Sequence, residues 1–216
     1  MYVVIEGNSS VGKTTQIELL EKQFRELDHE VLVVPSRYAD DDLSDILLEA
    51  LDEYVASANP VKSVRTDVML RSAYLAHVHE VVVEPALRAG VTVIQETGVD
   101  HVIASTGFAR GIGPSEVAQI IGWAQRGMHA QLTVLLDGLP DVHHADMVSG
   151  EEDAHLVDMR NRFKLLAGWQ KENHVVITAD RSIEIIHHDI MTEVMDAMKK
   201  AGEVFKEDPL EKMLRG

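Results

Sequence analysis

Five short apolar runs recur along the chain, at residues 2–5, 31–34, 91–94, 132–137 and 175–178. Each is four to six residues long and carries apolar residues at consecutive positions rather than at alternating ones. This pattern is typical of strands that are covered on both faces, as in a parallel sheet. We therefore predict five strands in one parallel sheet.

The segments between these runs place apolar residues at the spacing of one helix face. Residues 100–113 are rich in Gly, Ser and Thr, and are predicted to form a loop or a short helix. Alternating strands and helices predict an α/β fold with three layers, α/β/α, and right-handed crossovers. Ligands in such folds bind at the carboxyl ends of the strands. The predicted helices span 16–27, 43–55, 66–87, 114–125, 154–172 and 182–201.

A phosphate-binding motif stands between the first apolar run and the first predicted helix. It matches the pattern G-x-x-x-x-G-K-[ST], called the P-loop. Its glycines let the backbone curl so that N–H groups point inward, and the helix N-terminus adds partial positive charge. Lys13 is predicted to reach the β- and γ-phosphates of ATP, and the Thr14 hydroxyl to bind Mg²⁺. The motif reads Gly7, Asn8, Ser9, Ser10, Val11, Gly12, Lys13 and Thr14, with Thr15 following.

Polar residues at the ends of the other strands extend this site. Arg37 and Tyr38 follow the second strand, and Arg37 is predicted to bind a substrate phosphate. Glu96 ends the third strand, where a carboxylate suits Mg²⁺. Asp137 ends the fourth strand and would either hold Mg²⁺ or cap the next segment. The motif and the strand ends together predict a site for a nucleoside triphosphate with Mg²⁺.

The length of 216 residues suits one domain, and a hydrophobic content of 45% is ample for its core. We predict this domain over residues 1–202, followed by a charged tail at 203–216. Residues 141–155 carry several acidic residues and are predicted to be a short lid-like segment over the site.

Composition excludes several kinds of function. A formal net charge of −16 argues against nucleic-acid binding, which needs a basic face. There is no cysteine, and adjacent histidines at 143–144 and 187–188 are more typical of a surface than of a metal site. Neither an N-terminal signal nor a long apolar span is visible, so we expect a cytoplasmic protein without membrane contact.

The order of these segments resembles the thymidylate kinase family of nucleoside monophosphate kinases. The likeness covers almost the whole chain, from residue 2 to about residue 200. Its most specific parts are the P-A-L-x-x-G phrase before the third strand and the L-T-x-x-L-D phrase of the fourth. The similar segments are 4–16, 84–90, 107–111, 131–137 and 160–167.

The resemblance implies an enzyme that transfers the γ-phosphoryl group of ATP, with Mg²⁺, to a nucleoside monophosphate, thymidine monophosphate (dTMP) first. It also implies a homodimer. Lys13, Glu96 and Arg110 would be the catalytic residues, with Thr14 and Glu96 holding the metal. The acceptor would be bound by Arg37, Tyr38, Arg71, Tyr74, Thr106 and Arg110.

The chain departs from the family pattern where the chemistry takes place. Thr97 stands where the family carries an arginine, and Ser9 where it carries an acidic residue. Tyr74 replaces an arginine of the long helix, and Arg71 on the same face is the expected substitute. No Lys or Arg occurs from 127 through 159, where the family brings lid arginines over the phosphates. A second hypothesis therefore stays open: an ATP-binding protein of this fold that has lost transfer or acts on a different acceptor.

Overall fold

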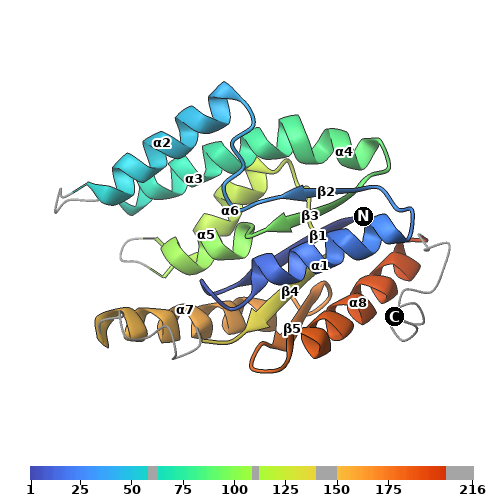
Figure 1. Cartoon of the computed structure of the whole chain (residues 1–216). Coiled ribbons are helices and arrows are strands. Elements are labelled where there is room, and N and C mark those ends of the chain that lie inside the picture. The colour runs from blue at the N-terminus through green and yellow to red at the C-terminus, as the bar shows by residue number, and fades with distance from the viewer. Residues whose placement is uncertain (58–62, 109–111, 140–149, 203–216) are drawn as a thin grey trace.

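The computed structural model describes residues 1–57, 63–108, 112–139 and 150–202, with the side chains of 150–153 left undescribed. Five parallel strands form one sheet in the order β2-β3-β1-β4-β5 (Figure 1). The sequence prediction of a five-stranded α/β fold is confirmed. The strands are β1 (Tyr2–Gly7), β2 (Val31–Val34), β3 (Thr92–Glu96), β4 (Leu132–Asp137) and β5 (His174–Thr178).

The helices follow the strands in a doubly wound order, and their predicted positions are confirmed to within a few residues. Residues 100–113, expected to be a loop or short helix, contain the short helix α5. The helices are α1 (Lys13–Glu26), α2 (Asp42–Ala56), α3 (Val64–Val78), α4 (Glu84–Arg88), α5 (Val99–Thr106), α6 (Pro114–Ala124), α7 (Gly150–Trp169) and α8 (Ile183–Ala201).

The helices cover the sheet on both faces (Figure 1). On one face, α1 and α8 pack on the strands, and Val3 and Ile5 of β1 point into this core. On the other face, Tyr2 and Val4 of β1 join a core with α2 and α3, and a further core lies between α3, α5, α6 and α7. Strand β1 is therefore buried on both sides, which explains its continuous apolar pattern.

The strand order places the phosphate-binding motif at the switch point of the sheet. β1 pairs with β3 on one side and with β4 on the other. In this register Ile5 lies beside Glu96, and Gly7 lies beside Leu136. The loop after β1 and the end of β3 thus meet at one edge, which is where ligands bind in such sheets.

The long helix predicted over 66–87 is divided. A π-helical turn, His79–Val83, separates α3 from α4, and the Glu84 N–H donates to the His79 carbonyl five residues earlier. Pro85 follows directly and has no N–H to donate, so the regular ladder cannot continue through this point. The wider turn accommodates the missing bond without ending the helical rod.

The predicted lid-like segment at 141–155 differs in part from the structure, and the predicted tail is not tested. Helix α7 already begins at Gly150, so residues 150–155, predicted as part of a lid-like segment, are helical. The rest of that segment and the tail at 203–216 lie outside the described residues. Within the described residues, no helix has the length and apolar character that crossing a membrane would need.

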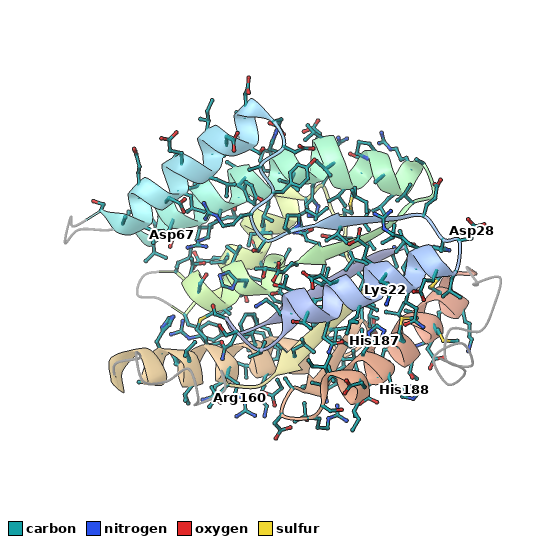
Figure 2. All side chains as sticks on the ribbon, viewed as in Figure 1. Lys22, Asp28, Asp67, Arg160, His187 and His188 are labelled. Carbon is teal, nitrogen blue, oxygen red and sulfur yellow. The ribbon has the colours of Figure 1, made fainter. Side chains whose placement is uncertain are left out.

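The adjacent histidines of α8 point to different surroundings (Figure 2). His187 is buried, and its Nε2 lies 2.7 Å from the Gln23 Oε1 on α1, whereas His188 is exposed. No group of three or more His, Cys, Asp or Glu side chains that could hold a metal ion occurs in the described part of the chain.

Candidate active site

The loop after β1 is tightly curled by residues in left-handed conformations. Gly7 has φ of 141°, Ser10 of 60° and Gly12 of 93°. A Cβ at Gly7 would lie 2.7 Å from the Leu136 carbonyl oxygen, so only glycine fits between β1 and β4. These conformations turn the loop back toward the start of α1, whose first turn contains no acidic residue. The loop therefore presents main-chain amides and the positive end of a helix dipole to one place.

Lys13 is folded back onto this loop. Its Nζ donates to the Gly7 carbonyl at 3.1 Å and to the Asn8 carbonyl at 2.7 Å. Burial lowers the pKa of Lys13, and the negative charges of Glu6 and Glu96 act in the opposite direction. The ammonium group is thus held directly over the curl, where bound phosphate oxygens would compete with the two carbonyls for it.

The hydroxyl of Thr14 meets the carboxylate of Glu96. Thr14 Oγ1 donates to Glu96 Oε1 at 2.8 Å, although the two residues are 82 positions apart in the sequence. A hydroxyl and a carboxylate are hard oxygen ligands, which is what Mg²⁺ prefers alongside phosphate oxygens and water. The donor set therefore fits a magnesium ion at the mouth of the loop.

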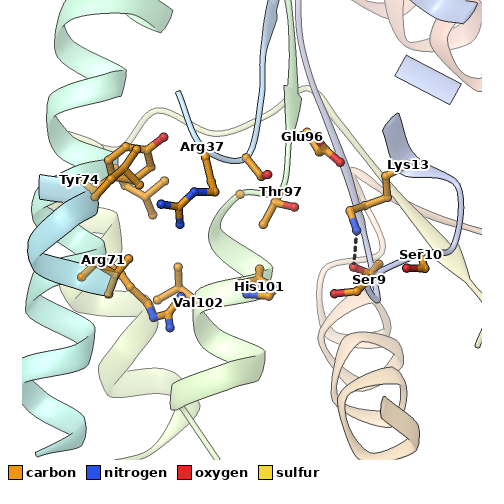
Figure 3. A pocket seen from close by; sticks show the side chains of 16 residues that line it. Ser9, Ser10, Lys13, Arg37, Arg71, Tyr74, Glu96, Thr97, His101 and Val102 are labelled. Carbon is orange, nitrogen blue, oxygen red and sulfur yellow. Dashed lines mark hydrogen bonds between the residues drawn. The ribbon is translucent and has the colours of Figure 1, made fainter. Parts of the chain in front are cut away.

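A cavity of about 390 Å³ opens beside Lys13 (Figure 3). Its polar lining includes Ser9 of the loop, Lys13 at the start of α1, Arg37 after β2, Arg71 of α3 and Glu96 of β3. Its apolar lining consists of Leu48, Leu51, Leu75 and Val102. The lining therefore combines cationic side chains with apolar ones, as suits a phosphorylated small molecule with an organic ring.

The two arginines of this cavity each have an acidic partner. The Arg37 guanidinium donates to both carboxylate oxygens of Asp52 on α2, at 2.9 and 2.5 Å. The Arg71 Nε donates to Asp67, one turn earlier on α3, at 2.7 Å. Both arginines line the cavity, so the predicted pair of phosphate contacts is spatially consistent, with each guanidinium oriented by a carboxylate.

Tyr74 fixes the loop after β2. Its hydroxyl accepts from the Tyr38 backbone N–H at 2.6 Å and donates to the Tyr38 carbonyl at 3.3 Å. Tyr74 also lines the cavity, whereas the Tyr38 hydroxyl donates to Asp40 at 3.1 Å and Tyr38 is absent from the described lining. The structure thus places Tyr74 at the site and the Tyr38 side chain beside it.

This arrangement can be compared with known proteins. The family model described as thymidylate kinase matches residues 5–190 of the chain. The chain belongs to the thymidylate kinase family. It is 31% identical to a thymidylate kinase of Cutibacterium acnes over 93% of this chain and 98% of that protein. It is 29% identical to one of Methylococcus capsulatus and 30% identical to one of Clavibacter michiganensis, over 89% of this chain in both cases and 94% and 93% of those proteins.

Family membership confirms the resemblance found in the sequence. The positions at which the chain departs from the family pattern can now be located in the structure. Thr97, at the position of an arginine in the family pattern, lines the cavity with φ of 64°. A β-branched residue is rarely found in this left-handed region, so the turn after β3 is held by its surroundings. The Gln95 side chain contributes by donating to the Thr97 carbonyl at 3.1 Å.

Thr106 and Arg110 are the two remaining residues predicted to contact the substrate. Thr106 is 1% exposed, its hydroxyl donates to the Val102 carbonyl at 2.6 Å, and it is not among the described lining residues. The hydroxyl thus serves helix α5, and we leave Thr106 out of the proposed substrate contacts. Arg110 lies outside the described residues, so its role stays a prediction.

The carboxylate of Asp137 is paired with two cations of α7. Its carboxylate accepts from the Arg160 Nε at 2.5 Å and Nη2 at 3.1 Å, and lies 3.3 Å from the Lys164 Nζ. The hydrogen bond with Arg160 holds the pKa of Asp137 below its ordinary value. The sequence left two roles open for Asp137, holding Mg²⁺ or capping the next segment. The ion pairs favour the second role, in which Asp137 anchors α7 through Arg160 (labelled in Figure 2).

Two residues at the site, Glu6 and His101, were not predicted from the sequence. Glu6 is 1% exposed, and its Oε1 accepts from the backbone N–H of Gly98 at 2.8 Å and of His101 at 3.3 Å. Burial, with the charge of Asp100, raises the pKa of Glu6 to about 8. His101 lines the cavity itself. A carboxylate inside an otherwise apolar strand was the available signal for Glu6, because such a position requires buried partners.

Proposed function

We propose that this chain is a nucleoside monophosphate kinase that transfers the γ-phosphoryl group of ATP to dTMP. The observation that carries the proposal is that a complete phosphate-binding loop borders a cavity lined by two arginines. Lys13 belongs to both, since it bonds to the loop carbonyls and lines the cavity. A donor on the loop and an acceptor in the cavity would therefore meet at this ammonium group.

The loop holds the donor. Backbone amides of residues 8–15 and the first turn of α1 surround the phosphates of ATP, and the Lys13 ammonium exchanges its carbonyl partners for phosphate oxygens. Thr14 and Glu96 would hold Mg²⁺, which would supply positive charge that neutralises the phosphates. Because the loop is already curled, little ordering is needed when the donor binds.

The cavity holds the acceptor. Arg37 and Arg71 bind its phosphate, and their carboxylate partners Asp52 and Asp67 fix the direction of each guanidinium. The leucine side chains of the cavity wall give the nucleobase an apolar surface. Arg110 is proposed as an additional contact, and a homodimer remains the expected assembly.

Phosphoryl transfer requires that the two substrates are correctly positioned and that positive charge lies near the transferred group. Phosphoryl transfer needs little covalent work from the protein, and an arginine at the transition state contributes a factor of about 10³ to 10⁵. Thr97 supplies no charge, and no Lys or Arg occurs from 127 through 159. We therefore expect transfer that is specific for its acceptor but slow.

A coupled assay of ADP release across the common nucleoside monophosphates tests the proposal. Turnover should depend on dTMP, and Lys13→Ala should abolish it while the far-UV spectrum stays unchanged. Lys22→Ala is the matched control. Lys22 (labelled in Figure 2) lies on the exposed face of the same helix, where its Nζ is 3.9 Å from the Glu26 carboxylate. ATP binding without turnover on any acceptor would instead support the hypothesis of a binding protein.

A further inference from the structure

His101 occupies a central position in the acceptor cavity. It lies in the first turn of α5 and lines the cavity together with Lys13 and Arg71. Figure 3 shows it between Arg71 on one side and the loop that carries Lys13 on the other. Its ring packs against Phe163 of α7, with ring centroids 6.2 Å apart. An anion bound between Lys13 and Arg71 would therefore lie next to this imidazole.

The surroundings of His101 favour its neutral form in the free protein. Burial, followed by electrostatic repulsion from Arg71, Lys13 and His155, lowers the pKa of His101 to about 4. These groups face it from α3, from the start of α1 and from α7. Glu6 of β1 lies behind it and accepts the His101 backbone N–H, and Asp100 precedes it in the chain. Glu96 of β3 shares the cavity, and α6 adds no charged residue to the described lining.

The other cations of the described cavity lining already carry their charge and have partners in the free protein. Arg37 is paired with Asp52, Arg71 with Asp67, and Lys13 with two loop carbonyls. Thr97, beside His101 in the lining, carries no charge. A phosphomonoester carries up to two negative charges, and among the described lining residues His101 is the neutral base that can still gain a positive charge.

We propose that His101 takes up a proton when the acceptor phosphate enters the cavity, and that its imidazolium then supplies charge that Thr97 does not. The inference rests on the proposed function and adds to it a pH-dependent affinity for the acceptor. A bound phosphate offsets the repulsion from Arg71 and Lys13 and adds attraction of its own, which favours protonated His101. Affinity for dTMP therefore rises as the pH falls, in the range where the complex titrates.

The size of the effect follows from linkage. Through this group alone, dTMP binds about tenfold more tightly one pH unit below the pKa that His101 has in the complex than it does far above that pKa. At a pH equal to that pKa, about half a proton is taken up per dTMP bound. Cations that bind a phosphate make the phosphate itself release protons, so net uptake must come from the protein.

Isothermal titration calorimetry with dTMP tests the inference, using two pH 7 buffers that differ in ionisation enthalpy. The full chain should take up protons, and His101→Gln should remove that uptake and the extra affinity at pH 6. His101→Asn serves as a second variant. His188→Gln is the matched control, because His188 is exposed on α8. Thymidine, which lacks the phosphate, should bind without uptake.

The outcomes separate this inference from the function on which it rests. Equal proton uptake by the wild type and His101→Gln, or a wild type that takes up none, overturns the role of His101 while dTMP binding still supports the kinase. No heat with dTMP at any pH overturns both. If both variants fail to fold, the NMR signals of the His101 ring in the wild type decide: a shift to the protonated position when dTMP is added at pH 7 supports the inference, and an unchanged neutral ring refutes it.

Discussion

Replacing Glu6 by glutamine should stabilise the protein, and increasingly so as the pH rises. Glu6 is buried beneath the phosphate-binding loop, and its Oε2 has no hydrogen-bond partner in the structure. Burial raises its pKa to about 8, so the side chain is largely protonated at neutral pH. Glutamine has nearly the same shape, and its carbonyl can accept from the Gly98 N–H as Oε1 does.

The sign and size follow from the two pKa values. In the unfolded chain Glu6 titrates near 4.5, whereas in the folded protein it titrates near 8. Between these values only the unfolded chain loses its proton, so the free energy of unfolding falls by about 1.4 kcal/mol for each pH unit. At pH 7 the free energy of unfolding has fallen by about 3 kcal/mol through Glu6, and above pH 8 it falls no further. Glu6→Gln removes this loss.

Urea or thermal unfolding at a series of pH values from 5 to 9 measures the effect. For a chain of this size, about 3 kcal/mol corresponds to a rise in Tm of roughly 6 to 12 °C at pH 7. The gap between variant and wild type should be small at pH 5 and widen toward pH 8. Glu18→Gln, on the exposed face of α1, should instead follow the wild-type curve. Parallel curves for wild type and Glu6→Gln would refute the raised pKa.

Three further substitutions test the site. Thr97→Arg should raise kcat for dTMP about tenfold or more, because it adds a cation beside the transferred group; an unchanged kcat would contradict the need for charge there. Arg71→Ala should raise the KM for dTMP about tenfold or more, while Arg65→Ala, exposed on the same helix, should leave it unchanged. Asp137→Asn should lower the free energy of unfolding by about 1–3 kcal/mol at pH 7. The Asp137 pKa lies below 3.8, so this difference should shrink as the pH falls toward and below that value, and a difference independent of pH would contradict it.

The parts of the fold that local chemistry determines could be predicted from the sequence. The five apolar runs and the loop from Gly7 to Thr14 depend on neighbours in the chain, and each lies where the pattern indicated. The π-helical turn was missed, although Pro85 carried the signal. The helical periodicity of 66–87 dominated the prediction, because a rod with one wider turn preserves most of its apolar face.

The partners of the site residues could not be predicted, because they come from distant parts of the chain. Glu6 meets residues 92 and 95 positions later, and Arg37 meets Asp52, 15 positions later on α2. Nothing in a single sequence reports such contacts before the strands and helices are placed. The same holds for Asp137, whose carboxylate fits a metal site by type but is paired with Arg160 and Lys164 in the fold.

The central claim is that this chain passes a phosphoryl group directly from ATP on the loop to dTMP in the neighbouring cavity. The most direct measurement uses ATP labelled at the γ-phosphate, with Mg²⁺ and dTMP, and separates the products. The account predicts labelled thymidine diphosphate from the wild type and none from Lys13→Ala. Label that stays on ATP, or that appears only as inorganic phosphate while dTMP is unchanged, would contradict it.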